Sequence, residues 1–155
     1  MDDHVFRGAQ PDDAGIQALA KQGVHTILDL RNSEERSERE EKLAESLGLK
    51  YISLPLSGYS APSNTQVSKA LAALNDQKEW PVFVHCKRGA DRTGTVIACY
   101  RISHDGWTNR QALDEAKGLG MSSMEIGMKH YILGFPRAVL EAAPKPMEPA
   151  GSSAK

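Results

Sequence analysis

The chain has 155 residues, of which 40% are hydrophobic and 25% are charged, and its formal net charge is −1. This length suits one domain with a complete hydrophobic core and is short for two domains. The near-neutral charge argues against a nucleic-acid or membrane-surface role, because both roles need a basic excess. No apolar run approaches the roughly 20 residues that a membrane-spanning helix requires, so we expect no membrane span.

Four apolar runs of strand length predict β-strands, at residues 5–7, 24–30, 49–54 and 81–85. Helical patterns lie between and after these runs, at about residues 12–22, 32–47, 64–75, 93–104, 109–119 and 124–142. This alternation predicts a single α/β domain with a central, mostly parallel sheet of four to five strands and helices on both faces. The run at 81–85 is the most continuously apolar, which is typical of a strand in the middle of a parallel sheet.

Local signals place the ends of several elements. Asp12 is a good N-cap for the first helix, and Gly23 follows the last turn of that helix, where glycine favours termination. The run at residues 34–45 is rich in acidic residues and also contains basic residues at helical spacing. We therefore interpret it as a solvated helix face with surface ion pairs. The last residues, 144–155, are rich in Pro, Ala and Ser and predict a flexible tail.

The two cysteines, Cys86 and Cys99, are too few for a disulfide framework. Cys99 falls in an apolar helical segment, so we expect a buried core thiol; a redox partner for Cys86 is the alternative. The first residues, MDDH, lack the basic and apolar regions of a secretory signal peptide, and we therefore expect a cytoplasmic protein. We also expect a monomer.

The most informative segment is HCKRGADRTG at residues 85–94, which follows the last strand and opens a helix. A thiol attacks phosphorus as the thiolate, so the segment must stabilise that anion at Cys86. The inward N–H groups of a tight loop and the positive end of the next helix would both do so. Arg92 adds a fixed charge and a planar fork suited to two phosphate oxygens. Gly89 permits a sharp turn, and Thr93 can hydrogen-bond the sulfur.

Cations outnumber the single carboxylate in this segment, which favours a strongly anionic substrate. We expect the phosphate of that substrate to be bound by the loop residues Lys87, Arg88, Gly89, Ala90 and Arg92. The pattern therefore predicts a phosphate-binding loop that carries its own nucleophile.

HCKRGADRTG resembles the signature loop of the cysteine-based protein tyrosine and dual-specificity phosphatases, HCxxGxxR followed by Ser or Thr. The sequences FRGAQP, LDLR at 28–31 and a PL-containing loop are similar to the compact, atypical dual-specificity phosphatases of bacteria, fungi and plants. The resemblance spans about residues 5–140, within a phosphatase domain that we place at 1–143. It implies hydrolysis of phosphomonoesters through a cysteinyl-phosphate, with Cys86 as nucleophile, Arg92 on the phosphate, and neither a metal nor a cofactor.

Three further residues lie at strand ends of the predicted sheet, and one of them, His85, is the first residue of the motif. His85 precedes the nucleophile, as in the family, and we expect it to shape the loop through backbone hydrogen bonds rather than to act as a base. Asp29 and Arg31 lie at the end of a strand, where the catalytic edge of an α/β sheet is found. Arg31 either contributes to the substrate pocket or pairs with a carboxylate, and we favour the pairing.

Cleavage of a phosphate ester also needs a proton for the leaving oxygen. The larger family takes it from an Asp on an upstream loop, but the corresponding residues here, 53–64, contain no Asp or Glu. Asp91 is the best replacement, as in the myotubularin group of lipid phosphatases, which it resembles at this position. Alternatively, Asp91 orients the loop, the leaving group needs little help, or the more distant Glu125 serves.

The substrate is left open between two classes. A basic residue after the nucleophile, Lys87, resembles phosphatases of inositol phosphates or phosphoinositides, and the compact family includes enzymes that act on inositol pyrophosphates. Phosphotyrosine is the other class, since Tyr59 could flank an aromatic ring, although we favour a plain surface position for this side chain. A rhodanese-type sulfurtransferase and a non-catalytic module that binds phosphorylated ligands are the competing functions.

Overall fold

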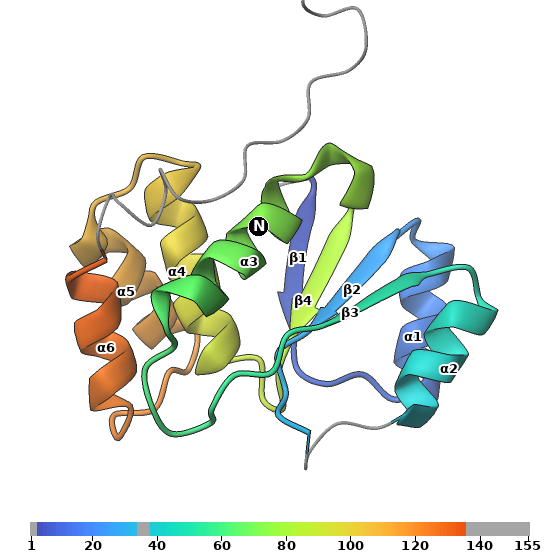
Figure 1. Ribbon diagram of the computed structural model, residues 1–155, viewed down its shortest axis with the longest axis horizontal. Coiled ribbons are helices and arrows are strands. Elements are labelled where there is room, and N and C mark those ends of the chain that lie inside the picture. The colour runs from blue at the N-terminus through green and yellow to red at the C-terminus, as the bar shows by residue number, and fades with distance from the viewer. Residues whose placement is uncertain (1–2, 34–37, 136–155) are drawn as a thin grey trace, which may run out of the picture.

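The sheet has four parallel strands in the order β1-β4-β2-β3 within residues 3–33 and 38–135, the part of the chain that the computed structural model describes (Figure 1). The strands are β1 Val5–Gly8, β2 Thr26–Asp29, β3 Lys50–Ser53 and β4 Val82–His85. The predicted parallel sheet is confirmed, and its most apolar strand, β4, lies between β1 and β2. The register aligns the last residues of all four strands in one row, Gly8, His85, Asp29 and Ser53.

Helices cover both faces of this sheet. They are α1 Asp13–Lys21, α2 Glu38–Ser46, α3 Asn64–Asn75, α4 Arg92–Ser103, α5 Asn109–Gly118 and α6 Ile126–Leu133, and a short 3-10 turn, η1, spans Gln77–Glu79. α1 and α2 lie on one face, and α3 to α6 lie on the other (Figure 1). Each face has its own apolar cluster because side chains alternate along a strand: Val82 and Val84 pack toward α3 and α4, whereas Phe83 packs toward α1 and α2.

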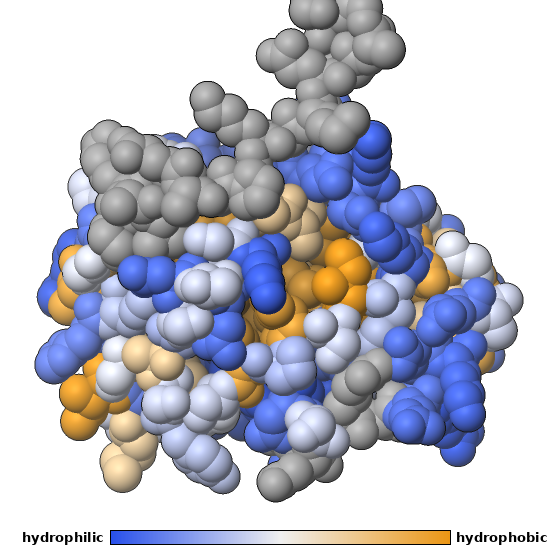
Figure 2. Space-filling view, in the orientation of Figure 1, coloured by the Kyte–Doolittle hydropathy of each residue, from blue (hydrophilic) through white to orange (hydrophobic). Residues whose placement is uncertain are grey.

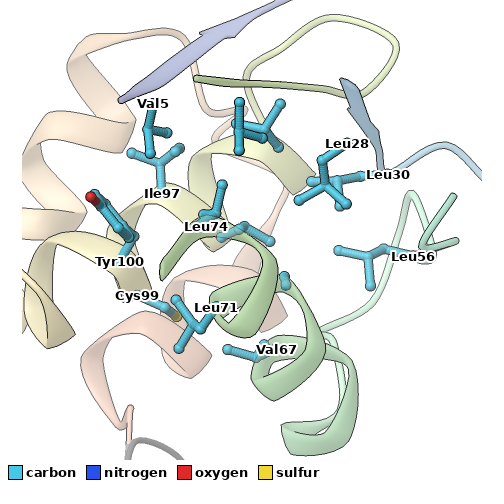
Figure 3. Packing of buried hydrophobic residues seen from close by; sticks show 14 of the residues in the cluster. Val5, Leu28, Leu30, Leu56, Val67, Leu71, Leu74, Ile97, Cys99 and Tyr100 are labelled. Carbon is cyan, nitrogen blue, oxygen red and sulfur yellow. The ribbon is translucent and has the colours of Figure 1, made fainter. Parts of the chain in front are cut away.

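The helix after the motif, α4, lies at the centre of the larger cluster. All residues from Arg92 to Tyr100 are buried, and Ile97 and Tyr100 pack against Val5 and Leu71 from β1 and α3 (Figure 3). Cys99 is fully buried in the same cluster, and burial raises the pKa of its thiol. It is therefore a core residue, as expected. The dense packing holds the first turn of α4 in a fixed position under the motif.

Most element boundaries agree with the sequence patterns. The Asp12 carboxylate accepts a hydrogen bond from the Gly15 N–H at the start of α1, which confirms the predicted cap. The last helix is an exception: the sequence predicts it over 124–142, but α6 spans Ile126–Leu133, and residues 136–142 lie outside the described residues. Phe135 precedes a proline, and the residue before proline disfavours the helical conformation. The predicted tail at 144–155 lies outside the described residues. None of the described helices is both long enough and apolar enough to span a membrane.

Candidate active site

The motif forms a loop, residues 86–91, which we call the cradle loop, between the end of β4 and the start of α4. Cys86 is 1% exposed, and its sulfur accepts a hydrogen bond from the Gly89 N–H at 3.3 Å. Gly89 has φ +75°, and a Cβ atom there would lie 2.4 Å from the carbonyl carbon and oxygen of Gly8. Both the backbone conformation and the lack of space therefore require glycine at this position.

β1 and the residues that follow it hold the cradle loop through two hydrogen bonds. Arg7 of β1 donates from Nη2 to the Gly89 carbonyl oxygen at 2.8 Å, and the Gln10 N–H donates to the Lys87 carbonyl oxygen at 3.1 Å. Burial lowers the pKa of Arg7, while the negative charges of Glu115 and of a Cys86 thiolate oppose that shift. Arg7 is thus a second cation within electrostatic reach of the sulfur. From the sequence, FRGAQP supports only the family resemblance and predicts no role for Arg7.

Arg92 and Thr93 form the first turn of α4, directly after the cradle loop. Arg92 is buried, and its guanidinium carbon lies 3.8 Å from the position that a Cβ on Gly58 would take, so the β3–α3 loop passes over it. The Thr93 hydroxyl is buried and has no hydrogen-bond partner among the described residues. A buried hydroxyl without a partner costs about 1–3 kcal/mol, and a phosphate or thiolate in the loop would relieve that cost. The N-terminus of α4 adds a positive dipole end at the same place.

The remaining cradle residues differ in exposure. Lys87 and Arg88 are exposed, whereas Ala90 is buried. Asp91 is half-buried: its Oδ1 accepts the Ser122 N–H at 2.8 Å, and its Oδ2 lies 3.6 Å from Nη1 of Arg88. The loop therefore presents two cations to solvent, while its carboxylate is turned toward the connection between α5 and α6.

A buried polar network lies behind the nucleophile, on the α2 side of the sheet. His85 places Nδ1 3.1 Å from the Cys86 carbonyl oxygen and Nε2 2.7 Å from Oε2 of Glu40. The other Glu40 oxygen pairs with Arg31 at 2.9 Å. Glu40 belongs to the acidic run that was interpreted as a solvated face, and for this residue the interpretation is wrong. The rest of α2 presents a hydrophilic surface, as expected (Figure 2). One face of α2, with Glu40 and Ala44, points inward because the helix packs against the sheet.

Arg31 makes the structural pairing that we favoured. It is 3% exposed and holds both oxygens of Asp29, from Nε at 3.0 Å and from Nη2 at 2.9 Å. The Tyr51 hydroxyl donates to Asp29 as well and bonds Glu40 at 2.8 Å. Burial alone would raise the pKa of Asp29, but the hydrogen bonds from Arg31 and Tyr51 outweigh it and hold the pKa below its ordinary value. Tyr51 was not singled out from the sequence.

Three members of this network have donor atoms close enough to hold a cation. Ligand atoms of Asp29, Glu40 and His85 lie within 4.8 Å of one another. The Arg31 guanidinium already bonds both carboxylates, so a metal ion would have to displace a buried cation or approach it closely. The donor set therefore fits ion pairs better than a metal.

The β3–α3 loop and the α5–α6 connection flank the cradle loop. Tyr59, on the first of these, is 91% exposed, which agrees with the surface position that we favoured. Glu125, on the second, is partly exposed. Burial and the negative charge of Asp91 raise the pKa of Glu125, although Arg88, Arg92 and Lys129 oppose the shift. Electrostatics therefore connects this distant candidate with the cradle.

Comparison with known proteins agrees with this geometry. The sequence model of a family described as "DSP-PTPase phosphatase fused to NAD+ Kinase" matches residues 1–132. The chain belongs to this phosphatase family. The match favours the phosphatase reading over the rhodanese-type alternative and confirms the resemblance that the motif carries.

Curated relatives include the dual specificity protein phosphatase TpbA of Pseudomonas aeruginosa, which is 28% identical over 116 residues, 74% of this chain and 50% of the relative. Inositol diphosphatase DSP1 of Oryza sativa is 28% identical over 149 residues, 93% of this chain and 66% of that protein. The chain thus spans about half the length of the TpbA proteins it matches.

Solved structures show the same fold. The core catalytic domain of the PP-IP phosphatase SIW14 from S. cerevisiae superposes with a TM-score of 0.78 at 21% identity, covering 88% of this chain and 83% of that one. P. aeruginosa TpbA gives a TM-score of 0.77 at 26% identity, covering 92% and 88%. These likenesses place the α/β domain among the phosphatase-like folds.

Proposed function

We propose that the chain is a cysteine-dependent phosphatase that hydrolyses phosphomonoesters through a cysteinyl-phosphate. The Cys86 thiolate forms an S–P bond while the P–O bond to the leaving group breaks, and a proton passes to the leaving oxygen. Water then attacks phosphorus, the S–P bond breaks, and the sulfur leaves as a thiolate with release of phosphate. Arg92, the loop N–H groups and Thr93 stabilise charge on the phosphoryl oxygens and on the sulfur.

One observation carries this proposal: the Cys86 sulfur accepts the Gly89 N–H at the positive end of α4, with Arg92 in the first turn of that helix. These groups are fixed before any substrate arrives, because α4 is buried and Arg7 holds the Gly89 carbonyl. Donors that are already oriented need no reorganisation during the reaction, which is how such sites lower barriers.

The test is the loss of turnover in Cys86→Ser. This variant should hydrolyse no aryl phosphate above background while still binding vanadate, because the loop N–H groups and Arg92 are unchanged. Cys99→Ala is the matched control; it should stay active, since Cys99 lies in the core. Residual activity of Cys86→Ser near the wild-type level would overturn the assignment of Cys86 as the nucleophile. Binding without turnover in the wild type would favour a non-catalytic module.

For the substrate class, we propose an inositol phosphate or pyrophosphate as a second candidate beside phosphoproteins. Lys87 and Arg88 are exposed residues of the cradle loop and can neutralise additional phosphates. Relatives named inositol diphosphatase and PP-IP phosphatase support the same direction. Ranking phosphotyrosine peptides against inositol pyrophosphates by kcat/KM, with Lys87→Ala and Arg88→Ala, tests it: the losses should be larger for the polyphosphates.

We further propose that the protein acts as a cytoplasmic monomer. Light scattering of the purified chain tests the monomeric state, and fractionation of the cells that produce it tests the location. A stable dimer in dilute solution would contradict the first part.

A further inference from the structure

The α5–α6 connection, residues 119–125, packs directly against the cradle loop. The Arg88 guanidinium donates to the Gly120 carbonyl oxygen at 3.2 Å, and Asp91 accepts the Ser122 N–H at 2.8 Å. The backbone packs closely there, because a Cβ on Gly120 would lie 3.7 Å from the Cβ of Ala90. Two residues of the phosphate-binding loop therefore set the position of the segment that leads into α6.

These contacts use both oxygens of Asp91. Oδ1 accepts the Ser122 N–H, and Oδ2 faces the Arg88 guanidinium. To reach a leaving group, the Asp91 side chain would have to give up a backbone donor on one oxygen and a neighbouring cation on the other. The geometry gives Asp91 the work of positioning this connection.

Glu125 stands at the other end of the same turn. Its N–H donates to the Ser122 carbonyl oxygen at 3.1 Å, and it precedes the first residue of α6. Its side chain makes no capping hydrogen bond, and within the described part of the chain no ion pair or side-chain hydrogen bond engages it. Two residues later, a Cβ on Gly127 would lie 3.5 Å from the backbone nitrogen of Ala61. The turn that carries Glu125 thus contacts the cradle loop through Ser122 and the β3–α3 loop through Gly127.

The β3–α3 loop, which this turn contacts, supplies no proton donor. The β3–α3 loop, residues 54–63, has no acidic residue, and the carboxylates of Asp29 and Glu40 are committed to Arg31 on the other face. The titratable and charged groups that act on Glu125 are Asp91, Arg88, Arg92 and Lys129. Burial and the negative charge of Asp91 raise the pKa of Glu125, although the three cations oppose that shift.

We infer that Glu125 is the proton donor of the reaction and that Asp91 is a positioning residue that holds its segment against the cradle. This inference rests on the proposed phosphatase function. In the first step, the Glu125 carboxylic acid gives its proton to the leaving oxygen as the P–O bond breaks and the S–P bond to Cys86 forms. In the second step, the Glu125 carboxylate takes a proton from the attacking water as the S–P bond breaks.

A series of esters with leaving groups of different acidity tests this role. In Glu125→Gln, hydrolysis of phenyl phosphate should fall by roughly 100-fold or more, because a general acid contributes about 10²–10⁴-fold. Hydrolysis of 2,4-dinitrophenyl phosphate should fall far less, since that leaving group departs without a proton. The decline of wild-type kcat/KM for phenyl phosphate at high pH should also disappear in the variant. Asp114→Asn on exposed α5 is the control and should match the wild type.

Asp91→Asn separates the two roles. It retains an oxygen that can accept the Ser122 N–H, so we expect similar modest losses on both esters and an unchanged high-pH limb. Equal losses on both esters in Glu125→Gln, or none, would overturn the inference, as would a leaving-group-dependent loss confined to Asp91→Asn. These outcomes require an active wild type that depends on Cys86. Failure of the proposed function would instead appear as a wild type with no hydrolysis of any ester.

Discussion

His85 and Glu40 meet at 2.7 Å in the core, although they are far apart in the sequence and lie on different elements. Their contact joins the residue before the nucleophile to a helix on the other face of the sheet. Because Glu40 also pairs with Arg31, the imidazole is held on one side by a fixed carboxylate and faces the Cys86 carbonyl on the other. The orientation of the cradle loop therefore depends on a residue of α2.

Removing this carboxylate should destabilise the protein strongly. Glu40→Ala removes the carboxylate that His85 Nε2 faces and one of the two buried carboxylates that Arg31 pairs with, and breaking a buried ion pair costs about 3–5 kcal/mol of unfolding free energy. Glu45→Ala, on the exposed side of the same helix, should change it by no more than about 0.5 kcal/mol. Urea denaturation measures both. Equal and small effects would mean that the network contributes little.

The same network predicts a pH dependence of stability. The pKa of Asp29 is lower in the folded protein than its ordinary value of 3.8, so the unfolded chain binds the proton more readily. The stabilisation from Asp29 is therefore complete above that value and is lost as the pH falls through the folded-state pKa. In Tyr51→Phe, which removes one hydrogen bond to Asp29, the folded-state pKa lies closer to the ordinary value, so the acid-induced loss of stability should be smaller and should be complete at higher pH. Superimposable pH–stability curves for the two proteins would contradict this reading.

Gly89 offers a steric test of the cradle loop. Gly89→Ala puts a Cβ where the Gly8 carbonyl already lies and imposes an unfavourable φ, so the loop must shift. We expect at least a roughly 100-fold loss of kcat/KM, because small displacements of positioned groups have such effects. Gly118→Ala is the control, since nothing lies within 4 Å of its added Cβ. Wild-type kinetics in Gly89→Ala would disprove the close packing of Gly8 and Gly89.

Arg92→Lys tests the geometry of phosphate binding at nearly constant charge. Lysine is a point charge and cannot reproduce the planar fork, so we expect a loss of both vanadate affinity and kcat. Arg110→Lys on exposed α5 should leave both values unchanged. If Arg92→Lys retains activity, charge alone is what the site needs from this residue.

The cradle loop could be predicted from the sequence because its residues are contiguous and its chemistry depends on local backbone. The parallel sheet and its central strand were predictable for a similar reason, from alternation and continuous apolarity. Arg7, Glu40 and Tyr51 could not be placed in this way, since each reaches the site through tertiary packing from another strand or helix. Glu40 shows the limit clearly: an acidic run predicts a solvated helix, and only the packing of α2 decides which carboxylate turns inward.

The most direct test of the account is to trap the covalent intermediate. Wild-type protein mixed with excess 2,4-dinitrophenyl phosphate and quenched within one turnover should carry one phosphoryl group, which peptide mass spectrometry should locate on Cys86. Cys86→Ser should carry none at any residue. Rapid turnover of the wild type with an unmodified Cys86, or with the phosphoryl group on another residue, would contradict the proposed mechanism.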